Sequence, residues 1–260
     1  MDPAGRTAVV TGAAGGIGGA ITRALVGAGA HTVIATDVRA DSIVTGDRIV
    51  PMALDVGDEA ATVALIDAVE REHGPIDLWF ANAGLTGGGG AESPNEMWDA
   101  QWRVNVMAHV YAARALLPGW IERGEGHLIT TASMAGILTT LGDGVYAATK
   151  HAAVGFAEWL AITHAADGVK VSCICPGAVD TAMLRGSTGN ADTAAAAIGG
   201  GGVLAPDEAA ARIVDAVRAD AFLILTHPEM HEYMERKASD TDRWIRGMSR
   251  QWERAKDLLG

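Results

Sequence analysis

Residues 7–18, TAVVTGAAGGIG, decide the fold: a short β-branched run leads into a glycine-rich turn. A helical pattern of apolar residues follows at once, over residues 17–28. Glycines let the chain turn tightly, and they leave backbone amides open at the helix N-terminus, where a pyrophosphate can bind. Strand, turn and helix together predict a dinucleotide-binding unit. A tight turn that binds no ligand is the alternative.

The same alternation of strand and helix continues along the chain. Helical patterns at residues 17–28, 58–73, 96–123, 145–166 and 207–219 separate β-branched runs at residues 7–11, 32–36, 49–54, 77–81, 127–132, 169–175 and 221–225. This alternation predicts an α/β fold, a doubly wound parallel sheet with helices on both faces. No linker divides residues 1–260, so we expect a single domain, with residues 226–260 as a C-terminal helical tail.

The composition excludes several classes of protein. The chain has 260 residues, 20 of them basic and 32 acidic, for a net charge of −12, so we expect no binding to nucleic acid or membrane surfaces. No apolar run is long enough for a membrane helix, and no signal pattern opens the chain. Cys173 and Cys175 lie two apart in a predicted strand, which excludes a disulfide framework. We expect a cytoplasmic protein.

The end of the second predicted strand bears on the choice of coenzyme. Asp37 lies nineteen residues beyond Gly18. A carboxylate here accepts hydrogen bonds from ribose hydroxyls and repels a 2′-phosphate, which favours NAD over NADP. Arg39 is two residues further on and would tolerate a phosphate. An ordinary loop carboxylate is the alternative for Asp37.

The loops after the third and fourth predicted strands hold further candidate contacts. Asp55 and Val56 stand where a carboxylate and an amide can meet an adenine edge. Asn82, Ala83 and Gly84 are small enough for a dinucleotide to lie against the backbone. Each of these residues, taken alone, is as typical of a helix cap or a turn.

A second group of residues has the pattern of a proton-transfer site. Tyr146 and Lys150 are four apart in a predicted helix, so their side chains share one face. The pKa of tyrosine is ordinarily about 10, and a nearby ammonium lowers it toward neutrality. Ser133 ends the fifth predicted strand, where its hydroxyl can hydrogen-bond a substrate oxygen beside the phenol. A solvated helix face is the alternative for the Tyr146–Lys150 pair alone.

These motifs, in this order, resemble the short-chain dehydrogenase/reductase family over about the first 225 residues. The matching pieces are Thr11-Gly12-x-x-x-Gly16-x-Gly18, Asp55, Asn82-Ala83-Gly84, Asn105, Ser133, Tyr146-x-x-x-Lys150 and Pro176-Gly177-x-x-x-Thr181. The resemblance implies a Rossmann fold and direct hydride transfer between a nicotinamide dinucleotide and the substrate, without a metal.

The resemblance also implies residue roles. Tyr146 would be the general acid/base, Lys150 would lower its pKa and hold the nicotinamide ribose, and Ser133 would orient the reacting oxygen. Asn105 would interrupt the long helix and hold a proton-relay water, and Thr181 would bind the carboxamide; the residues alone equally fit a solvent-facing Asn105 and a capping Thr181. The expected dinucleotide contacts are Gly12, Gly15, Gly16, Ile17, Gly18, Asp37, Asp55, Val56, Asn82, Ala83, Gly84, Tyr146, Lys150, Pro176, Gly177, Val179 and Thr181.

The tail departs from the family pattern. Its apolar residues, Trp244, Ile245, Met248 and Trp252, recur at helical spacings among interleaved charges. Three uses stay open: a wall over the substrate pocket, an arm that stabilises a dimer, or a helix packed on its own subunit. Its length argues against an acyl-carrier-protein reductase, which has a short tail. The segment His227-Pro228-Glu229-Met230-His231 lacks the spacing of a zinc helix, so we expect no metal there.

The expected substrate pocket is apolar. Its candidate lining residues are Met134, Ala135, Gly136, Ile137, Leu138, Leu141, Met183 and Leu184, and Arg185 is the nearest group that could meet an anion. Glycine clusters at residues 87–90 and 199–202 follow strands at the same edge. The small-residue stretch 186–202 fits either a mobile lid or an ordinary surface loop.

The sequence therefore predicts an NAD(H)-dependent oxidoreductase that interconverts a secondary alcohol and its ketone. An apolar substrate (cyclic, aromatic or steroid-like) and a homodimer or homotetramer are expected. An NADP-dependent ketone reductase is the first alternative. A nucleotide-sensing protein would have no use for an activated phenol, and an epimerase or dehydratase on this fold usually has a longer chain with a substrate domain.

Overall fold

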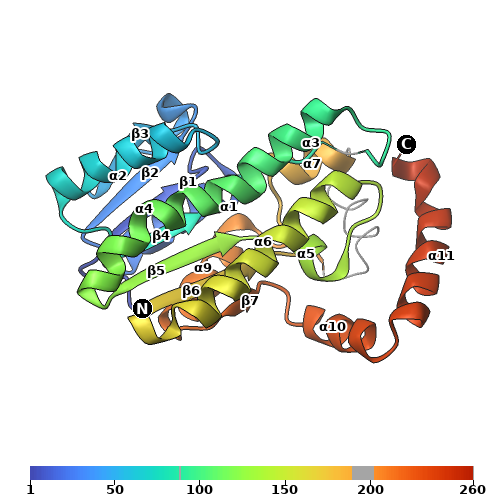
Figure 1. Cartoon of the computed structure of the whole chain (residues 1–260). Helices are drawn as coiled ribbons and strands as arrows, with labels where there is room; N and C mark the ends of the chain where they lie inside the picture. Colours follow the sequence, from blue (N-terminus) through green and yellow to red (C-terminus); the bar gives the residue numbers. More distant parts are fainter. Residues whose placement is uncertain (88, 189–201, 260) are drawn as a thin grey trace.

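The computed structural model describes residues 1–87, 89–188 and 202–259. Within them, seven parallel strands form one sheet in the order β3-β2-β1-β4-β5-β6-β7 (Figure 1). The strands are β1 (Thr7–Thr11), β2 (Thr32–Asp37), β3 (Ile49–Ala53), β4 (Leu78–Ala81), β5 (Gly126–Thr131), β6 (Val169–Cys175) and β7 (Leu223–Leu225). Each lies within two residues of its predicted limits. The chain changes direction across the sheet between β1 and β4, and ligands bind at such a switch point.

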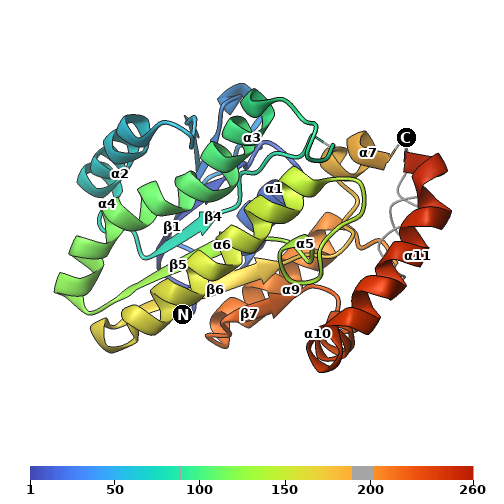
Figure 2. The same cartoon turned by 45° about the vertical axis from the view of Figure 1, so that its right-hand side comes forward.

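Helices cover both faces of the sheet, which confirms the doubly wound fold (Figure 2). On one face α1 (Gly16–Gly27) packs against α9 (Pro206–Arg218). The other face is covered by α2 (Glu59–His73), α4 (Ala108–Arg123) and α6 (Gly144–Thr163). Successive strand residues alternate between the two layers, so Val9 lies in one apolar core and Val10 in the other. Both cores hold the carboxyl ends of the strands in fixed positions.

The long helix predicted at residues 96–123 is not continuous. It consists of α3 (Asn95–Trp102), a π-helical turn at Arg103–Met107, and α4. Asn105 lies in the π turn, and its side chain bonds outside the helix, to Leu85 and Thr149. The continuous helix was therefore wrong at its centre, while the interruption implied by the family resemblance is present. Such π bulges are frequent at functional sites.

Three short elements were not predicted. They are α5 (Ala135–Leu138), α7 (Ala182–Thr188) and a 3₁₀ turn at Ala40–Ser42. The helix predicted at residues 145–166 ends at Thr163, and a second 3₁₀ turn follows at Ala165–Asp167. The predicted lid falls mostly on residues 189–201, which lie outside the described part of the chain.

The tail forms two helices after β7, namely α10 (Met230–Ser239) and α11 (Thr241–Leu259). Met230 is buried in a small cluster with Met134 and Leu138, which anchors α10 beside α5. From there α11 runs across the end of the molecule toward α7 (Figures 1 and 2). None of the helices in the described ranges combines the length and the apolar character needed to cross a bilayer.

Candidate active site

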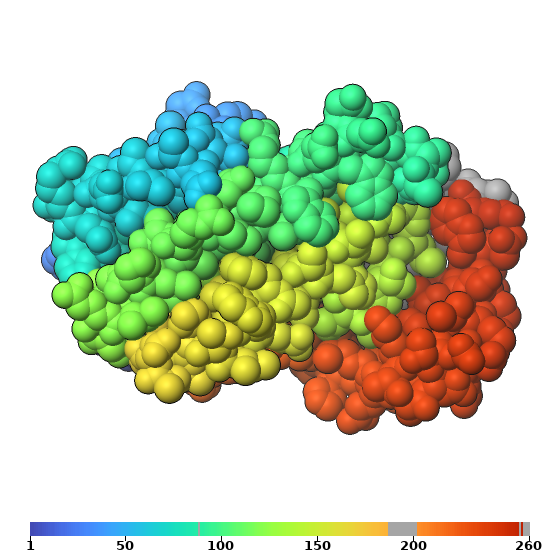
Figure 3. Space-filling model, viewed as in Figure 1, coloured from blue at the N-terminus to red at the C-terminus, as the bar shows by residue number. Residues whose placement is uncertain are grey.

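A cavity of about 1770 Å³ opens at the carboxyl edge of the sheet. The loops after β1 to β6 form its walls, and the tail closes it on one side. Figure 3 shows the tail, in red, covering the end of the molecule toward which the strands run. Of the three uses left open for the tail, the structure therefore has the first, in which the tail forms a wall of the cavity.

The glycine turn has the geometry that a pyrophosphate needs. Gly12 and Gly16 have φ values of 68° and 55°, in the left-handed region that favours glycine. No atom lies within 4 Å of the position where Gly15 would carry a Cβ. No side chain caps the start of α1, so its first amides are open to a ligand. Gly12, Gly15, Gly16 and Ile17 line the cavity.

Gly18 has a different position from the other glycines of the turn. It does not line the cavity, and a Cβ there would lie 2.2 Å from the Gly12 carbonyl oxygen and 2.5 Å from the Asn82 amide nitrogen. Glycine at this position lets α1 pack closely on the end of β1. Gly18 thus shapes the turn through close packing inside the protein and not by lining the cavity.

Asp37 and Arg39 lie on the same wall of the cavity. The Asp37 carboxylate accepts hydrogen bonds at 3.2 Å from the backbone amides of Ala14 and of Arg39. The Asp37 carboxylate therefore stabilises the glycine turn and also lines the cavity. The Arg39 side chain is exposed beside it.

The other residues predicted to contact the dinucleotide also make hydrogen bonds that stabilise the local fold. Asp55 accepts from the Gly57 amide at 2.8 Å, which holds the turn before α2. Asn82 donates from Nδ2 to the Thr11 carbonyl at 2.9 Å, and the Thr11 hydroxyl accepts from the amides of Asn82 and Ala83. These bonds clamp β4 to β1. Cavity walls nevertheless include all of these predicted residues, together with Val56 and Gly84.

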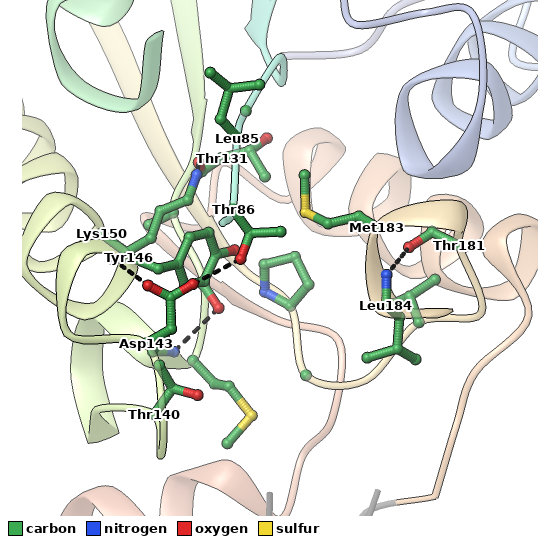
Figure 4. Close-up of a pocket in the computed structure, with 18 of the residues that line it drawn as sticks. Leu85, Thr86, Thr131, Thr140, Asp143, Tyr146, Lys150, Thr181, Met183 and Leu184 are labelled. Atoms are coloured by element: carbon green, nitrogen blue, oxygen red, sulfur yellow. Dashed lines mark hydrogen bonds between the residues drawn. The ribbon is translucent and has the colours of Figure 1, made fainter. Parts of the chain in front are cut away.

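Tyr146 and Lys150, two of the candidate proton-transfer residues, project from α6 beside Thr131 of β5 (Figure 4). Lys150 Nζ lies 5.5 Å from the centroid of the Tyr146 ring and donates to the Thr131 carbonyl at 2.9 Å. Ser133, two residues beyond β5, interacts with the phenol, whose pKa it lowers, and is 8% exposed. All three residues line the cavity. A solvated helix face is thereby excluded for the Tyr146–Lys150 pair.

Burial dominates the electrostatics of this group. It raises the pKa of Tyr146 to about 12, against the hydrogen bond from Ser133, which lowers it. Burial also lowers the pKa of Lys150 to about 8. The sequence led us to expect an ammonium that lowers the pKa of the phenol, but desolvation has the larger effect on this group.

Asn105 is fully buried and does not line the cavity. Its Oδ1 accepts from the Leu85 amide at 2.8 Å, and its Nδ2 donates to the Leu85 carbonyl at 2.9 Å and the Thr149 hydroxyl at 3.1 Å. A Cβ on Gly84 would lie 3.3 Å from Asn105 Oδ1 and 3.4 Å from Lys150 Nζ, so Asn105 lies close behind the lysine. The solvent-facing alternative is wrong.

The loop after β6 supplies the opposite wall. Pro176, Gly177, Val179 and Thr181 line the cavity, and in Figure 4 Thr181, Met183 and Leu184 face α6 across it. The Thr181 hydroxyl accepts from the Leu184 amide at 3.2 Å, so this residue also caps α7. Gly177 lies against His227, where a Cβ would come within 2.6 Å of the imidazole.

Sequence reasoning missed Asp143, which is 9% exposed on the cavity wall. It caps α6: Oδ1 accepts from the Tyr146 amide at 2.9 Å, and Oδ2 accepts from the Thr86 hydroxyl at 2.8 Å. Its charge raises the pKa of Tyr146. An Asp directly before an apolar helical run is a helix-start signal, which the sequence did contain.

The expected apolar pocket is only partly correct. Six of the predicted residues line the cavity: Met134, Ala135, Leu138, Leu141, Met183 and Leu184. Gly136 and Ile137 do not, because they face α6 and the core. Arg185 is also absent from the wall, and it pairs with Asp180 at 2.9 Å. The tail instead adds charge that was not expected, from Arg236, Arg243 and Arg250.

The histidines of the segment at 227–231 have separate environments. His227 is buried, with Nδ1 2.8 Å from the Thr226 hydroxyl, and the exposed His231 pairs with Glu235. Among the residues the structure describes, no three His, Cys, Asp or Glu side chains form a potential metal site.

Comparisons with known proteins agree with this geometry. The profile of the short chain dehydrogenase family matches residues 6–191. The 1-deoxy-11-beta-hydroxypentalenate dehydrogenase of Streptomyces exfoliatus is 36% identical over 236 residues, covering 86% of this chain and 84% of the relative. The 3beta-hydroxysteroid dehydrogenase 2 of Eggerthella lenta is 31% identical over 189 residues, covering 68% of this chain and 72% of the relative.

Solved structures of similar proteins have the same fold. A short-chain dehydrogenase from Burkholderia cenocepacia in complex with NADP has a TM-score of 0.83 at 24% identity, over 95% of this chain and 99% of that one. A relative from Burkholderia phymatum in complex with NAD has a TM-score of 0.82 at 27% identity, over 93% and 96%.

Proposed function

The chain belongs to the short-chain dehydrogenase family, and on that premise we propose that it interconverts a secondary alcohol and its ketone with NAD(H). One observation carries the proposal: Ser133, Tyr146 and Lys150 line the same cavity as the open glycine turn. A nucleotide and a reacting hydroxyl can therefore meet in one space. A nicotinamide dinucleotide, when bound, supplies the ring that accepts or donates hydride.

The residues of this chain supply position and a proton. In the oxidative direction the substrate hydroxyl lies against Ser133 Oγ and Tyr146 Oη, and Tyr146 Oη takes its proton as the carbonyl forms. In reduction the same oxygen returns the proton. Lys150 stays beside the phenol because the Thr131 carbonyl holds its ammonium, and a positive charge at that place favours the phenolate.

The residues along the carboxyl edge of the sheet fit a dinucleotide. The open amides of α1 suit the pyrophosphate, and Asp37 suits the hydroxyls of the adenosine ribose. Preference for NAD rests on the negative charge of Asp37, which opposes a 2′-phosphate. NADP is the second candidate because Arg39 is exposed on the same wall.

For the substrate we propose an apolar body. Met134, Leu138, Leu141, Met183 and Leu184 line the same cavity as the predicted proton-transfer residues, and burial of their apolar surface favours a hydrophobic ligand. The two curated relatives are named for hydroxylated substrates, which supports an alcohol as the reacting group.

A homodimer or homotetramer is the proposed assembly. Two large apolar side chains of α6, Trp159 and Ile162, are 55% and 79% exposed, and they favour contact with a second copy. Light scattering of the purified protein would give the mass. A monomer at micromolar concentration would overturn this part of the proposal.

The Tyr146→Phe variant tests the proposed chemistry. It keeps the ring and removes the hydroxyl, so turnover of a secondary alcohol should fall by a factor of about 10³ or more. NADH binding, followed by nicotinamide fluorescence, should stay within about two-fold. Tyr111→Phe is the matched control, because Tyr111 does not line the cavity. Unchanged turnover in Tyr146→Phe would overturn the assignment.

Titration with NADH and with NADPH tests the coenzyme. Tighter binding of NADH is expected from the charge of Asp37. Tighter binding of NADPH would assign selection to Arg39 instead. If neither dinucleotide bound at millimolar concentration, the whole proposal would fail.

A further inference from the structure

The inner face of α11 carries an arrangement of donors that the proposed reaction does not use. Arg243 and Arg250 both line the cavity and lie seven residues apart, two helical turns or about 10.5 Å along the axis. Within the described part of the chain, neither guanidinium has a hydrogen-bond or ion-pair partner. Most other arginines do have such a partner, as Arg6, Arg114 and Arg212 illustrate.

A glycine separates these two arginines on the same face. Gly247 also lines the cavity, and among the described residues a Cβ at this position would meet nothing closer than Arg250 Nη2, at 4.0 Å, apart from the backbone of α11 itself. Glycine inside a helix costs about 1 kcal/mol relative to alanine, and nothing inside the chain requires it here. The missing side chain leaves a notch between two cations.

A third donor stands beside the notch. Trp244 lines the cavity, and its buried indole Nε1 has no hydrogen-bond partner among the residues that the structure describes. Buried donors of this kind are ordinarily satisfied, so an acceptor from outside the chain is indicated. The one acidic residue on this stretch of wall, Asp240, is already engaged, since its carboxylate accepts from the Arg243 backbone amide at 2.8 Å.

The charge of the notch contrasts with that of the whole chain, which has a net charge of −12. Two unpaired guanidiniums on the wall of a cavity in an acidic protein attract an anion and disfavour a cation. A guanidinium offers parallel N–H donors that match the two oxygens of a carboxylate.

We propose that the notch at Arg243, Gly247 and Arg250 binds a carboxylate of the substrate. This inference rests on the proposed function, because it places the apolar body of the substrate between the notch and Tyr146. The ligand class is a hydrophobic hydroxy acid or keto acid, with the reacting carbon and the carboxylate at opposite ends.

A series of matched ligands tests the notch by binding. The probes are 7-oxooctanoate, 9-oxodecanoate and 11-oxododecanoate, each compared with its methyl ester and titrated into the complex of the protein with its reduced dinucleotide. For the best-fitting length, the acid should bind at least about ten-fold more tightly than the ester, equivalent to about 1.4 kcal/mol. High salt should reduce the difference.

The variant pair Arg243→Gln with Arg250→Gln should remove this preference. The acid should lose about ten-fold in affinity, while the ester and the dinucleotide change by less than about two-fold. The matched control is Arg246→Gln with Arg254→Gln, which removes the same charge from α11 away from the cavity wall. Control and wild type should behave alike.

Gly247→Leu and Gly247→Ala separate binding from folding. Leucine should fill the notch and weaken binding of the acid, whereas both substitutions favour the helix, so a loss of binding would not reflect unfolding. Equal affinity of wild type for acid and ester, or an acid preference that survives in the Arg243/Arg250 variant, would overturn the inference.

Turnover distinguishes this inference from the proposed function. The corresponding hydroxy acids and hydroxy esters are offered with NAD and with NADP. Oxidation of both forms at equal kcat/KM would support the dehydrogenase proposal and contradict the binding of a substrate carboxylate in the notch. Acid-selective binding without any oxidation of these alcohols or reduction of the ketones would leave the notch standing and count against the dehydrogenase chemistry.

Discussion

Gly18 in α1 and Gly247 in α11 look alike in the sequence, as glycines within helical patterns, but the structure requires them for opposite reasons. A Cβ on Gly18 would collide with the Gly12 carbonyl at 2.2 Å, whereas a Cβ on Gly247 would meet only Arg250 Nη2 at 4.0 Å. The first glycine is required by contacts inside the chain. The second leaves space for something outside it.

The regions around these glycines differ in the same way. α1 packs tightly against α9 and the sheet, with six of its residues buried. α11 touches the rest of the molecule mainly through α10, with Trp252 lying 3.6 Å from the Cβ position of Gly142. We infer that the nucleotide region is a rigid part of the core and that the tail is an added wall whose residues select the substrate. The following predictions test that separation.

The largest effect is expected from Gly18→Val. The added side chain cannot fit between α1 and β1, so the free energy of unfolding should fall by about 3 kcal/mol or more, and NADH binding should be lost with it. Urea denaturation followed by circular dichroism gives the first quantity. Gly247→Ala is the control and should raise stability by up to about 1 kcal/mol. A stable Gly18→Val protein that binds NADH would contradict the assigned role of this glycine.

A smaller effect, confined to the nucleotide region, is expected from Asp37→Ala. Loss of the carboxylate removes both the ribose acceptor and the repulsion of a 2′-phosphate, so the ratio of NAD to NADP affinities should fall by about ten-fold or more. Asp41→Ala, in the 3₁₀ turn nearby and off the cavity wall, is the matched control. An unaltered ratio would remove Asp37 from coenzyme selection.

Removal of α11, the second helix of the tail, should affect the binding of the substrate and leave the nucleotide region unchanged. A chain that ends at Asp240 keeps α10, which stays anchored by Met230 and by the bond from Lys237 Nζ to the Ile137 carbonyl at 2.6 Å. Dinucleotide affinity should stay within about two-fold, while the preference for a carboxylate over its ester should fall about ten-fold. A parallel loss of dinucleotide affinity would show that the two regions are coupled.

The smallest effect, a displaced pH profile, is expected from Asp143→Asn. Asparagine keeps the cap on α6 but removes the charge that raises the pKa of Tyr146. The pKa of the phenol should fall, so the rising limb of the oxidation rate should move to lower pH, as should the falling limb of the reduction rate. The other groups facing the phenol, Ser133, Lys150 and Cys175, are unchanged.

Two controls accompany this measurement. Thr86→Val removes one hydrogen-bond partner of the Asp143 carboxylate without altering charge, so its pH profile should keep the wild-type position. Asp143→Ala should lower stability by about 1 kcal/mol through loss of the cap. Equal profiles for wild type and Asp143→Asn would exclude an electrostatic role for this carboxylate.

Local sequence was sufficient for the strands and for the glycine turn. Their β-branched runs and breaker residues act over a few neighbouring positions, so they could be recognised without the partners that each strand meets. The Tyr146–Lys150 pair was recognisable for the same reason, since four residues is one helical turn. The helix over residues 96–123 was misjudged because its interruption depends on Leu85 and Thr149, which are distant in sequence.

The charge of the pocket was misjudged for a related reason. Arg243 and Arg250 are seven residues apart, so the sequence does indicate that they share one side of a helix in the tail. It does not indicate which side faces the cavity. That depends on α10 docking against α5 and turning α11 across the strand ends.

The parallel sheet, the glycine turn and the Tyr146–Lys150 pair could be predicted from the sequence, because each of these follows from periodicity and local backbone chemistry. Only the tertiary structure decided what those residues face. Burial sets the pKa of Tyr146 at about 12 and that of Lys150 at about 8, and the fold of the tail places on the wall of the cavity two guanidiniums that have no partner among the described residues. Desolvation and long-range contacts exist only once distant segments pack together, and a linear pattern does not contain them.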